Sequence, residues 1–116
     1  MSEIAKVQFP YNDAEVLALT ATGAQSLEIS GSLTLIDGVT VEALTGSRTI
    51  NLTIDAQTRI GARIVVLSKT NGTETTVFGT GMVGVTITGV AGKTNTNEFI
   101  YDGTTFKQVG AKQQID

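Results

Sequence analysis

Apolar and polar residues alternate along most of the chain, in short runs separated by turn-forming residues. Successive side chains of a β-strand point to opposite faces, so this alternation predicts strands with one face inward and one face in solvent. Many short strands in quick succession predict an all-β fold, either a small antiparallel β-sandwich or a jelly-roll or barrel-like domain. The predicted strands cover residues 26–29, 33–36, 39–43, 49–54, 63–67, 75–78, 85–90, 98–102 and 105–109.

The N-terminal end of the chain has a different pattern. Residues 1–12 hold the only proline, Pro10, which lies between Phe9 and Tyr11. Proline fixes its own φ angle and disfavours helix at the residue before it. We therefore predict an extended N-terminal arm over residues 1–12, followed by a single β domain over residues 13–116.

The start of the β domain allows two interpretations. Asn12 as N-cap and Glu15 three residues later could cap one helical turn. Residues 16–20, Val-Leu-Ala-Leu-Thr, are equally typical of a strand. Both alternatives stay open from the sequence.

A weak internal repeat occurs at a constant spacing, where Leu27 matches Leu52 and Ile29 matches Ile54. The match fades in the second half of the chain. A β-solenoid would need at least three convincing repeats. A duplicated pair of hairpins, or coincidence in a β-rich sequence, is the favoured interpretation.

Composition limits the partners that the chain can have. With 116 residues the chain has the length of one domain, and only 16% of its residues are charged, for a net charge of −3. Its eight basic residues are scattered, whereas phosphate backbones need clustered Lys or Arg, so nucleic acid is not an expected partner. No stretch approaches the roughly 18 apolar residues of a membrane span, so we expect a soluble protein without a secretion signal or membrane insertion.

The sequence offers little catalytic chemistry. It contains no His and no Cys, which removes the commonest general base, the thiolate nucleophile and the usual zinc ligands. We therefore expect no enzyme activity, no catalytic residues, no cofactor and no metal. Two Asp-Gly pairs, Asp37-Gly38 and Asp102-Gly103, are interpreted as turns, the second as a tight type I′ hairpin.

One glycine motif matches the Gly-x-Gly-x-x-Gly dinucleotide-binding pattern: Gly79-Thr80-Gly81-Met82-Val83-Gly84. That pattern binds a pyrophosphate only where a helix follows the glycines. Residues 85–88, Val-Thr-Ile-Thr, instead have the composition of a strand. The motif is interpreted as a flexible loop or bulge.

Three β runs in the second half of the chain suggest a family. They are residues 61–67, residues 85–89 and residues 99–106, the last of which ends in Tyr101-Asp102-Gly103-Thr104-Thr105-Phe106. Their order resembles small β modules of bacteriophage tail fibres, head fibres and capsid-decorating proteins, over about residues 45–110. The resemblance implies a non-enzymatic virion structural protein, a head-decoration, head-fibre or tail module. It also implies a homotrimer in contact with capsid or tail proteins of the particle.

The aromatic residues supply candidate contact sites. Phe9, Pro10 and Tyr11 lie on the predicted arm, and aromatic side chains make good anchors because they bury a large apolar area with few rotors to fix. We predict that these three residues attach the chain to the particle, against the alternative that they pack onto their own domain.

A second group of candidates lies in the β domain. Phe99, Tyr101 and Phe106 are expected in the core or in a subunit interface, and Arg63 either reaches solvent or pairs with a carboxylate at an interface. The alternative function is a carbohydrate- or receptor-binding module of a fibre that contacts surface glycans. Such modules use exposed aromatic platforms, and a chain with no Trp and two Tyr has few of them.

Overall fold

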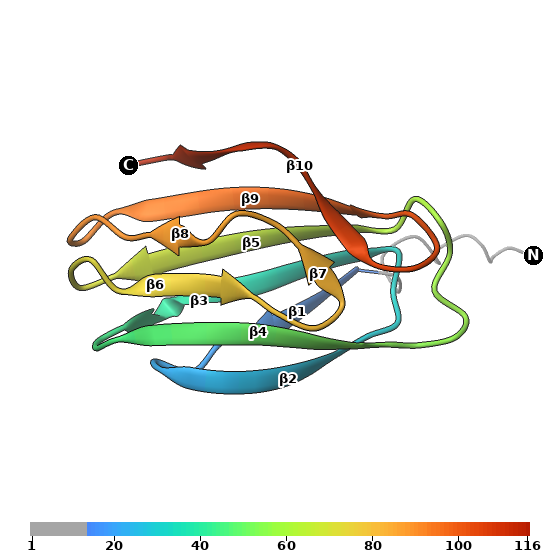
Figure 1. Cartoon of the computed structure of the whole chain (residues 1–116), viewed down its shortest axis with the longest axis horizontal. Coiled ribbons are helices and arrows are strands. Elements are labelled where there is room, and N and C mark those ends of the chain that lie inside the picture. The colour runs from blue at the N-terminus through green and yellow to red at the C-terminus, as the bar shows by residue number, and fades with distance from the viewer. Residues whose placement is uncertain (1–13) are drawn as a thin grey trace, which may run out of the picture.

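The computed structural model describes residues 14–116, which form ten strands and no helix (Figure 1). The all-β prediction is confirmed. The strands are β1 (Ala14–Ala18), β2 (Gly23–Ile29), β3 (Leu33–Ala43), β4 (Ser47–Ile54), β5 (Arg63–Thr70), β6 (Thr75–Phe78), β7 (Met82–Val83), β8 (Ile87–Thr88), β9 (Thr94–Tyr101) and β10 (Phe106–Gln114).

The strands form two sheets, and the chain crosses between them after nearly every strand. The larger sheet, sheet A, has the order β1-β3-β5-β9-β10-β7, and the smaller one, sheet B, has the order β2-β4-β6-β8. From β1 to β6 the chain alternates strictly between the two sheets, so it follows a coiled path (Figure 1). Each return to a sheet adds the next strand beside the previous one.

This path makes most strand pairs parallel, so the prediction of an antiparallel fold is wrong for five of the eight pairs. From β1 to β6, each strand that returns to a sheet by way of the opposite one enters from the same end as the strand before it in that sheet, and the two run parallel. The fifth parallel pair is β7 with β10. The antiparallel pairs are β5 with β9, β9 with β10, and β6 with β8. Alternation of side chains is the same in both kinds of pair, which is why the sequence pattern did not distinguish them.

The weak internal repeat has a structural basis. Leu27 of β2 pairs directly with Leu52 of β4 in parallel register. The next coil is longer, since Ser47 of β4 pairs with Thr75 of β6. The interpretation as duplicated hairpins is wrong for these strands, because β2 and β4 are parallel neighbours and not two arms of hairpins. The alternative of coincidence in a β-rich sequence stays open.

The start of the β domain is a strand, and the glycine motif is mostly loop. β1 begins at Ala14, so the strand alternative there is confirmed over the helical turn, while the predicted arm and its Phe9, Pro10 and Tyr11 lie outside the described residues. The glycine motif at 79–84 contains β7 with loop on either side and no following helix, as the loop interpretation expected.

The two Asp-Gly pairs behave differently from one another. Asp102-Gly103 does turn the chain between β9 and β10, but the loop has four residues rather than the two of a type I′ hairpin, with Gly103 at a φ of 100°. Asp37-Gly38 lies inside the continuous strand β3, where the register with β5 shifts after Gly38. The Asp37 carboxylate accepts hydrogen bonds from the Val39 amide at 2.8 Å and the Thr40 hydroxyl at 2.5 Å, so it bends the strand and does not end it.

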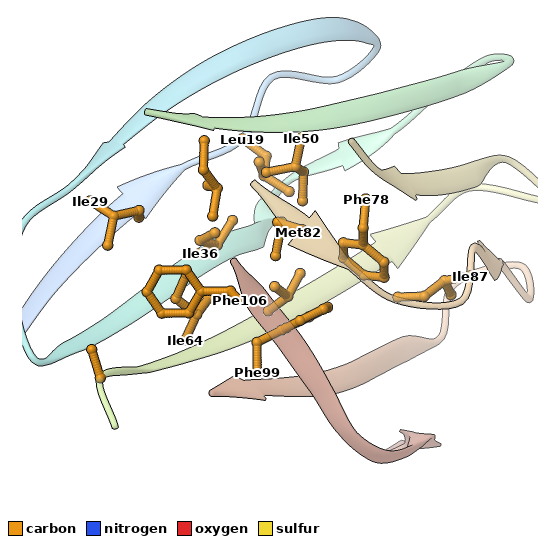
Figure 2. Close-up of a cluster of buried hydrophobic side chains, with 13 residues drawn as sticks. Leu19, Ile29, Ile36, Ile50, Ile64, Phe78, Met82, Ile87, Phe99 and Phe106 are labelled. Atoms are coloured by element: carbon orange, nitrogen blue, oxygen red, sulfur yellow. The ribbon is translucent and has the colours of Figure 1, made fainter. Parts of the chain in front are cut away.

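The hydrophobic core lies between the two sheets (Figure 2). Ile36, Ile64 and Phe99 of sheet A face Ile50 and Phe78 of sheet B, and all of them are buried. The rings of Phe78 and Phe99 meet edge to face with 4.7 Å between their centroids. Burial of alternating aliphatic and aromatic side chains from both layers supplies the main stabilising free energy of such a fold.

A buried polar side chain of β9 lacks a hydrogen-bond partner in this core. Asn97 points inward from β9, beside Val66 of β5 in the paired register, and neither atom of its amide is hydrogen-bonded. An unpaired buried amide costs free energy, whereas an apolar group of similar shape does not.

We therefore expect Asn97→Leu to stabilise the protein by about 1 kcal/mol, because it removes an unpaired polar group from among the inward-facing side chains next to Val66. Urea unfolding followed by circular dichroism measures the change. A lower midpoint for the variant would show that the Asn97 amide is satisfied in solution.

The bend in β3 makes the stability depend on pH. The hydrogen bond from Thr40, then the one from the Val39 amide and the nearby charge of Arg48, lower the pKa of Asp37 despite some desolvation. A lowered folded-state pKa means that the stabilisation is present above the unfolded value of about 3.9 and is lost as the pH falls through the folded-state pKa.

We expect Asp37→Asn to lower the unfolding midpoint at pH 7 and to reduce the further loss on acidification to pH 3. The control is Glu28→Gln, at an exposed position on β2. An Asp37→Asn variant that loses as much stability on acidification as the unmodified chain would contradict the assignment.

Candidate functional site

The clearest candidate site is the outer face of sheet A, the side turned away from the core. Inward positions of β3 and β5 are buried, and the residues between them point outward. Many of these outward residues are apolar, although outward positions in a sheet with one wet face are normally polar. We call this surface the outer face; its residues include Val16, Leu33, Leu35, Arg63, Val65, Leu67, Thr96, Glu98, Ile100, Lys107 and Val109.

Strand register aligns the apolar residues of the outer face in a row. Val16 of β1 pairs with Leu35 of β3, which pairs with Val65 of β5. Val65 pairs in turn with Glu98 of β9, and Glu98 with Val109 of β10. Val16 is 66% exposed, so an apolar stripe that crosses three strands ends at a solvent-facing side chain.

Two shallow hollows occupy this face and share Val65. One of about 380 Å³ lies over β1, β3 and β5 and includes Val16, Leu33 and Leu35. The other, of about 450 Å³, lies where β10 departs from β9, and Glu98 and Val109 are among its lining residues. The register of β10 against β9 shifts between Val109 and Gln113, which opens the second hollow.

An ion pair lies beside the apolar row. The guanidinium of Arg63 donates to the Glu98 carboxylate at 2.5 Å, and the two side chains are 47% and 42% exposed. Arg63 is thus a surface residue with a carboxylate partner in its own chain. Exposed pairs of this kind add at most about 1 kcal/mol to stability.

The other candidate interface residues lie elsewhere. Phe99 and Phe106 are fully buried in the core of the chain and do not contribute to its surface, so of the two predicted positions the core is the correct one. Tyr101 is half-buried and its ring packs on Phe106 with 4.9 Å between centroids. Of the four residues, Arg63 alone belongs to the outer face.

The structure also gives a central role to a residue that the sequence analysis treated as one of eight scattered bases. Arg48 of β4 is 0% exposed. Its side chain crosses from sheet B to sheet A and donates to the carbonyl oxygens of Val41 at 2.8 Å, Gly38 at 3.0 Å and Lys69 at 3.2 Å. It donates further to the carbonyl of Thr20 at 3.3 Å.

A sequence signal for this position existed. Arg48 is in phase with Ile50 and Leu52, the inward residues of β4, so alternation alone places it toward the core. Gly38 is its counterpart, since a Cβ atom there would lie 2.5 Å from Nη2 of Arg48 and 2.7 Å from the Leu67 carbonyl oxygen. The bend in β3 therefore needs glycine to admit the guanidinium.

Hydroxyl groups extend this contact between the sheets. The Ser68 hydroxyl of β5 accepts from Nη2 of Arg48 at 3.2 Å and lies 2.7 Å from the Thr76 hydroxyl of β6. Burial lowers the pKa of Arg48, and the charge of Asp37 opposes that effect. The guanidinium stays protonated and serves as a structural cross-link.

We expect Arg48→Met to cost about 3 kcal/mol of stability, because it leaves several buried acceptors without a donor. The matched control is Arg59→Met, at an exposed position outside the strands, where we expect a change within about 0.5 kcal/mol. Chemical unfolding of both variants measures the difference. Equal midpoints for the two would mean that water satisfies the carbonyls as well as Arg48 does.

Within residues 14–116, no group of three or more His, Cys, Asp or Glu side chains is placed to hold a metal ion. In that range, no helix has the length and apolar character needed to cross a membrane. Comparisons of the chain with protein-family models, curated proteins and solved structures found no match.

Proposed function

We propose that the chain is a non-enzymatic structural protein of a bacteriophage particle, a head-decoration, head-fibre or tail module that works as a homotrimer. The observation that carries the proposal is the outer face, where an apolar row that includes Leu35 and Val65 lies on the surface of a single chain. Contiguous exposed apolar surface is typical of protein contact sites. A structural module of an assembly requires such a surface and requires no catalytic group.

The resemblance to phage modules supports the same proposal. The last of the sequence runs that carry this resemblance ends in residues 101–106, which form the turn between β9 and β10 and contribute Phe106 to the core. The motif is thus a folding element of the module, and its recurrence in phage fibres would reflect a shared β architecture. We regard a compact two-sheet module of the sandwich type as the fold that this role requires.

Attachment to the particle is assigned to the N-terminal arm. We propose that Phe9, Pro10 and Tyr11 bind a capsid or tail protein, while residues 14–116 supply the folded module. The localisation is accordingly the virion, after synthesis and assembly in the host cytoplasm.

Glycan binding by a fibre end is the alternative function, and the structure gives it less support. Among residues 14–116 the aromatic side chains are Phe78, Phe99, Tyr101 and Phe106, and none of them is exposed. Stacking on a sugar ring needs an accessible aromatic face. A glycan array with the assembled protein tests this alternative.

The proposed location can be tested on virions. We expect gold-labelled antibodies against residues 14–116 to bind intact particles of the phage that encodes the chain, at a fixed place on the head or tail. Absence of the chain from purified virions, combined with its presence in the infected-cell lysate, would contradict the proposed function.

The arm is tested by its deletion. A chain without residues 1–12 should keep its far-ultraviolet β spectrum, because the described core lies wholly within residues 14–116, and should disappear from purified virions. The full-length chain, expressed from the same genomic site, is the control. Unfolding of the truncated chain would show that the arm belongs to the core.

A further inference from the structure

We infer that copies of this chain meet through the outer face of sheet A, and that Arg63 of one copy pairs there with Glu98 of the next. The inference rests on the proposed homotrimer and names the surface that forms it. Three features of the face indicate a second copy as the occupant: its apolar row, its self-complementary charges and its size.

The apolar row supplies the attraction. Val16 at 66% and Leu33 at 47% exposure flank Leu35 and Val65, which are half-buried in the isolated chain. Covering such side chains contributes roughly 25 cal/mol for each Å² of apolar surface removed from water. A second copy brings apolar side chains of its own outer face to the contact, so apolar surface on one copy is covered by apolar surface on the next.

The charges of the face fit a copy of the chain better than a charged partner. Arg63 and Glu98 lie side by side, so the face carries a positive and a negative charge next to one another. Around a three-fold axis that passes beside this pair, Arg63 of each copy can face Glu98 of the next, and such a contact closes into a ring. Both side chains are about half exposed, so the guanidinium and carboxylate groups remain accessible to an ion pair between two copies.

The size of the face is adequate for this contact. Five of the strands of sheet A, β1, β3, β5, β9 and β10, lie next to one another. At about 4.8 Å between strands and about 3.3 Å per residue, five strands of some seven residues cover on the order of 550 Å² in flat projection. Specific interfaces bury about 800 Å² of accessible surface per partner, which is the same order.

Light scattering on a sizing column tests the apolar part of the inference. We expect the full chain to have the mass of three chains, and Val16→Glu to reduce it to the mass of one. The Val16 side chain is largely in solvent, so this variant should keep its fold. The matched control is Val85→Glu, at a 74% exposed valine in the loop after β7, which should keep the mass of the unmodified protein.

Charge reversal identifies the paired residues. We expect Arg63→Glu alone and Glu98→Arg alone to be monomeric or strongly weakened in association, because each brings like charges together both within and between copies. A mixture of the two single variants should associate more strongly than either variant alone. A mixed trimer has two contacts between unlike variants, in which positions 63 and 98 carry opposite charges, and one contact between identical variants, in which like charges remain. Each separate variant at the total concentration of the mixture is the control.

Three results would overturn the inference: a monomeric unmodified chain at all concentrations, an unchanged mass for Val16→Glu, or a mixture of charge variants that stays as dissociated as its components. A monomeric chain that labels virions would mean that another virion protein covers the face, so the proposed location would stand without this interface. An associating chain that is absent from virions would leave the interface intact and remove the proposed function.

Discussion

The arrangement of the two sheets depends on one buried cation. Arg48 enters from β4 of sheet B and donates to main-chain carbonyls of β3 and β5 in sheet A and to Thr20 after β1. Those oxygens belong to three successive coils, so one side chain of sheet B binds main-chain acceptors of three coils at once. A guanidinium suits this position because its donors spread in a plane and can reach several carbonyls at once. The bend at Asp37 and the absence of a side chain at Gly38 both serve to admit it.

The sequence predicted the strands well and their partners poorly. Alternation located most strands of sheets A and B. The inward position of Arg48 was not predicted, because the predicted strand began one residue later, although Arg48 is in phase with the inward residues of β4. Parallel pairing could not be read from alternation, because both kinds of ladder have the same side-chain period. Of the candidate interface, Phe99 and Phe106 were ambiguous because a core and an interface select the same aromatic residues, and only the packing distinguishes them.

The outer face could not have been found from the sequence alone, for a related reason. Leu35 and Val65 alternate with buried residues in their own strands, and a run such as Arg-Ile-Val-Val-Leu is typical of a strand covered on both sides. Sheet B covers one side of these strands. The register that brings Val16, Leu35 and Val65 into one row joins segments that are far apart in the chain, and it becomes visible only once the parallel order of β1, β3 and β5 is known.

The coiled path also leaves the two sheets unequal at their ends. Within residues 14–116, β1 and β2 are the outermost strands at one end of their sheets, and both belong to the first coil. The opposite end is closed by β9, β10 and β7 in sheet A and by β8 in sheet B, through three antiparallel pairs and the parallel pair of β10 with β7. The parallel coils differ in length, so the number of residues from one strand to its neighbour in the same sheet is not fixed. A gene encoding this architecture can therefore lengthen its product by inserting whole coils ahead of β1, with the closed end left unchanged. Growth in one direction by small modular additions is a property well suited to proteins whose length must be adjusted during evolution.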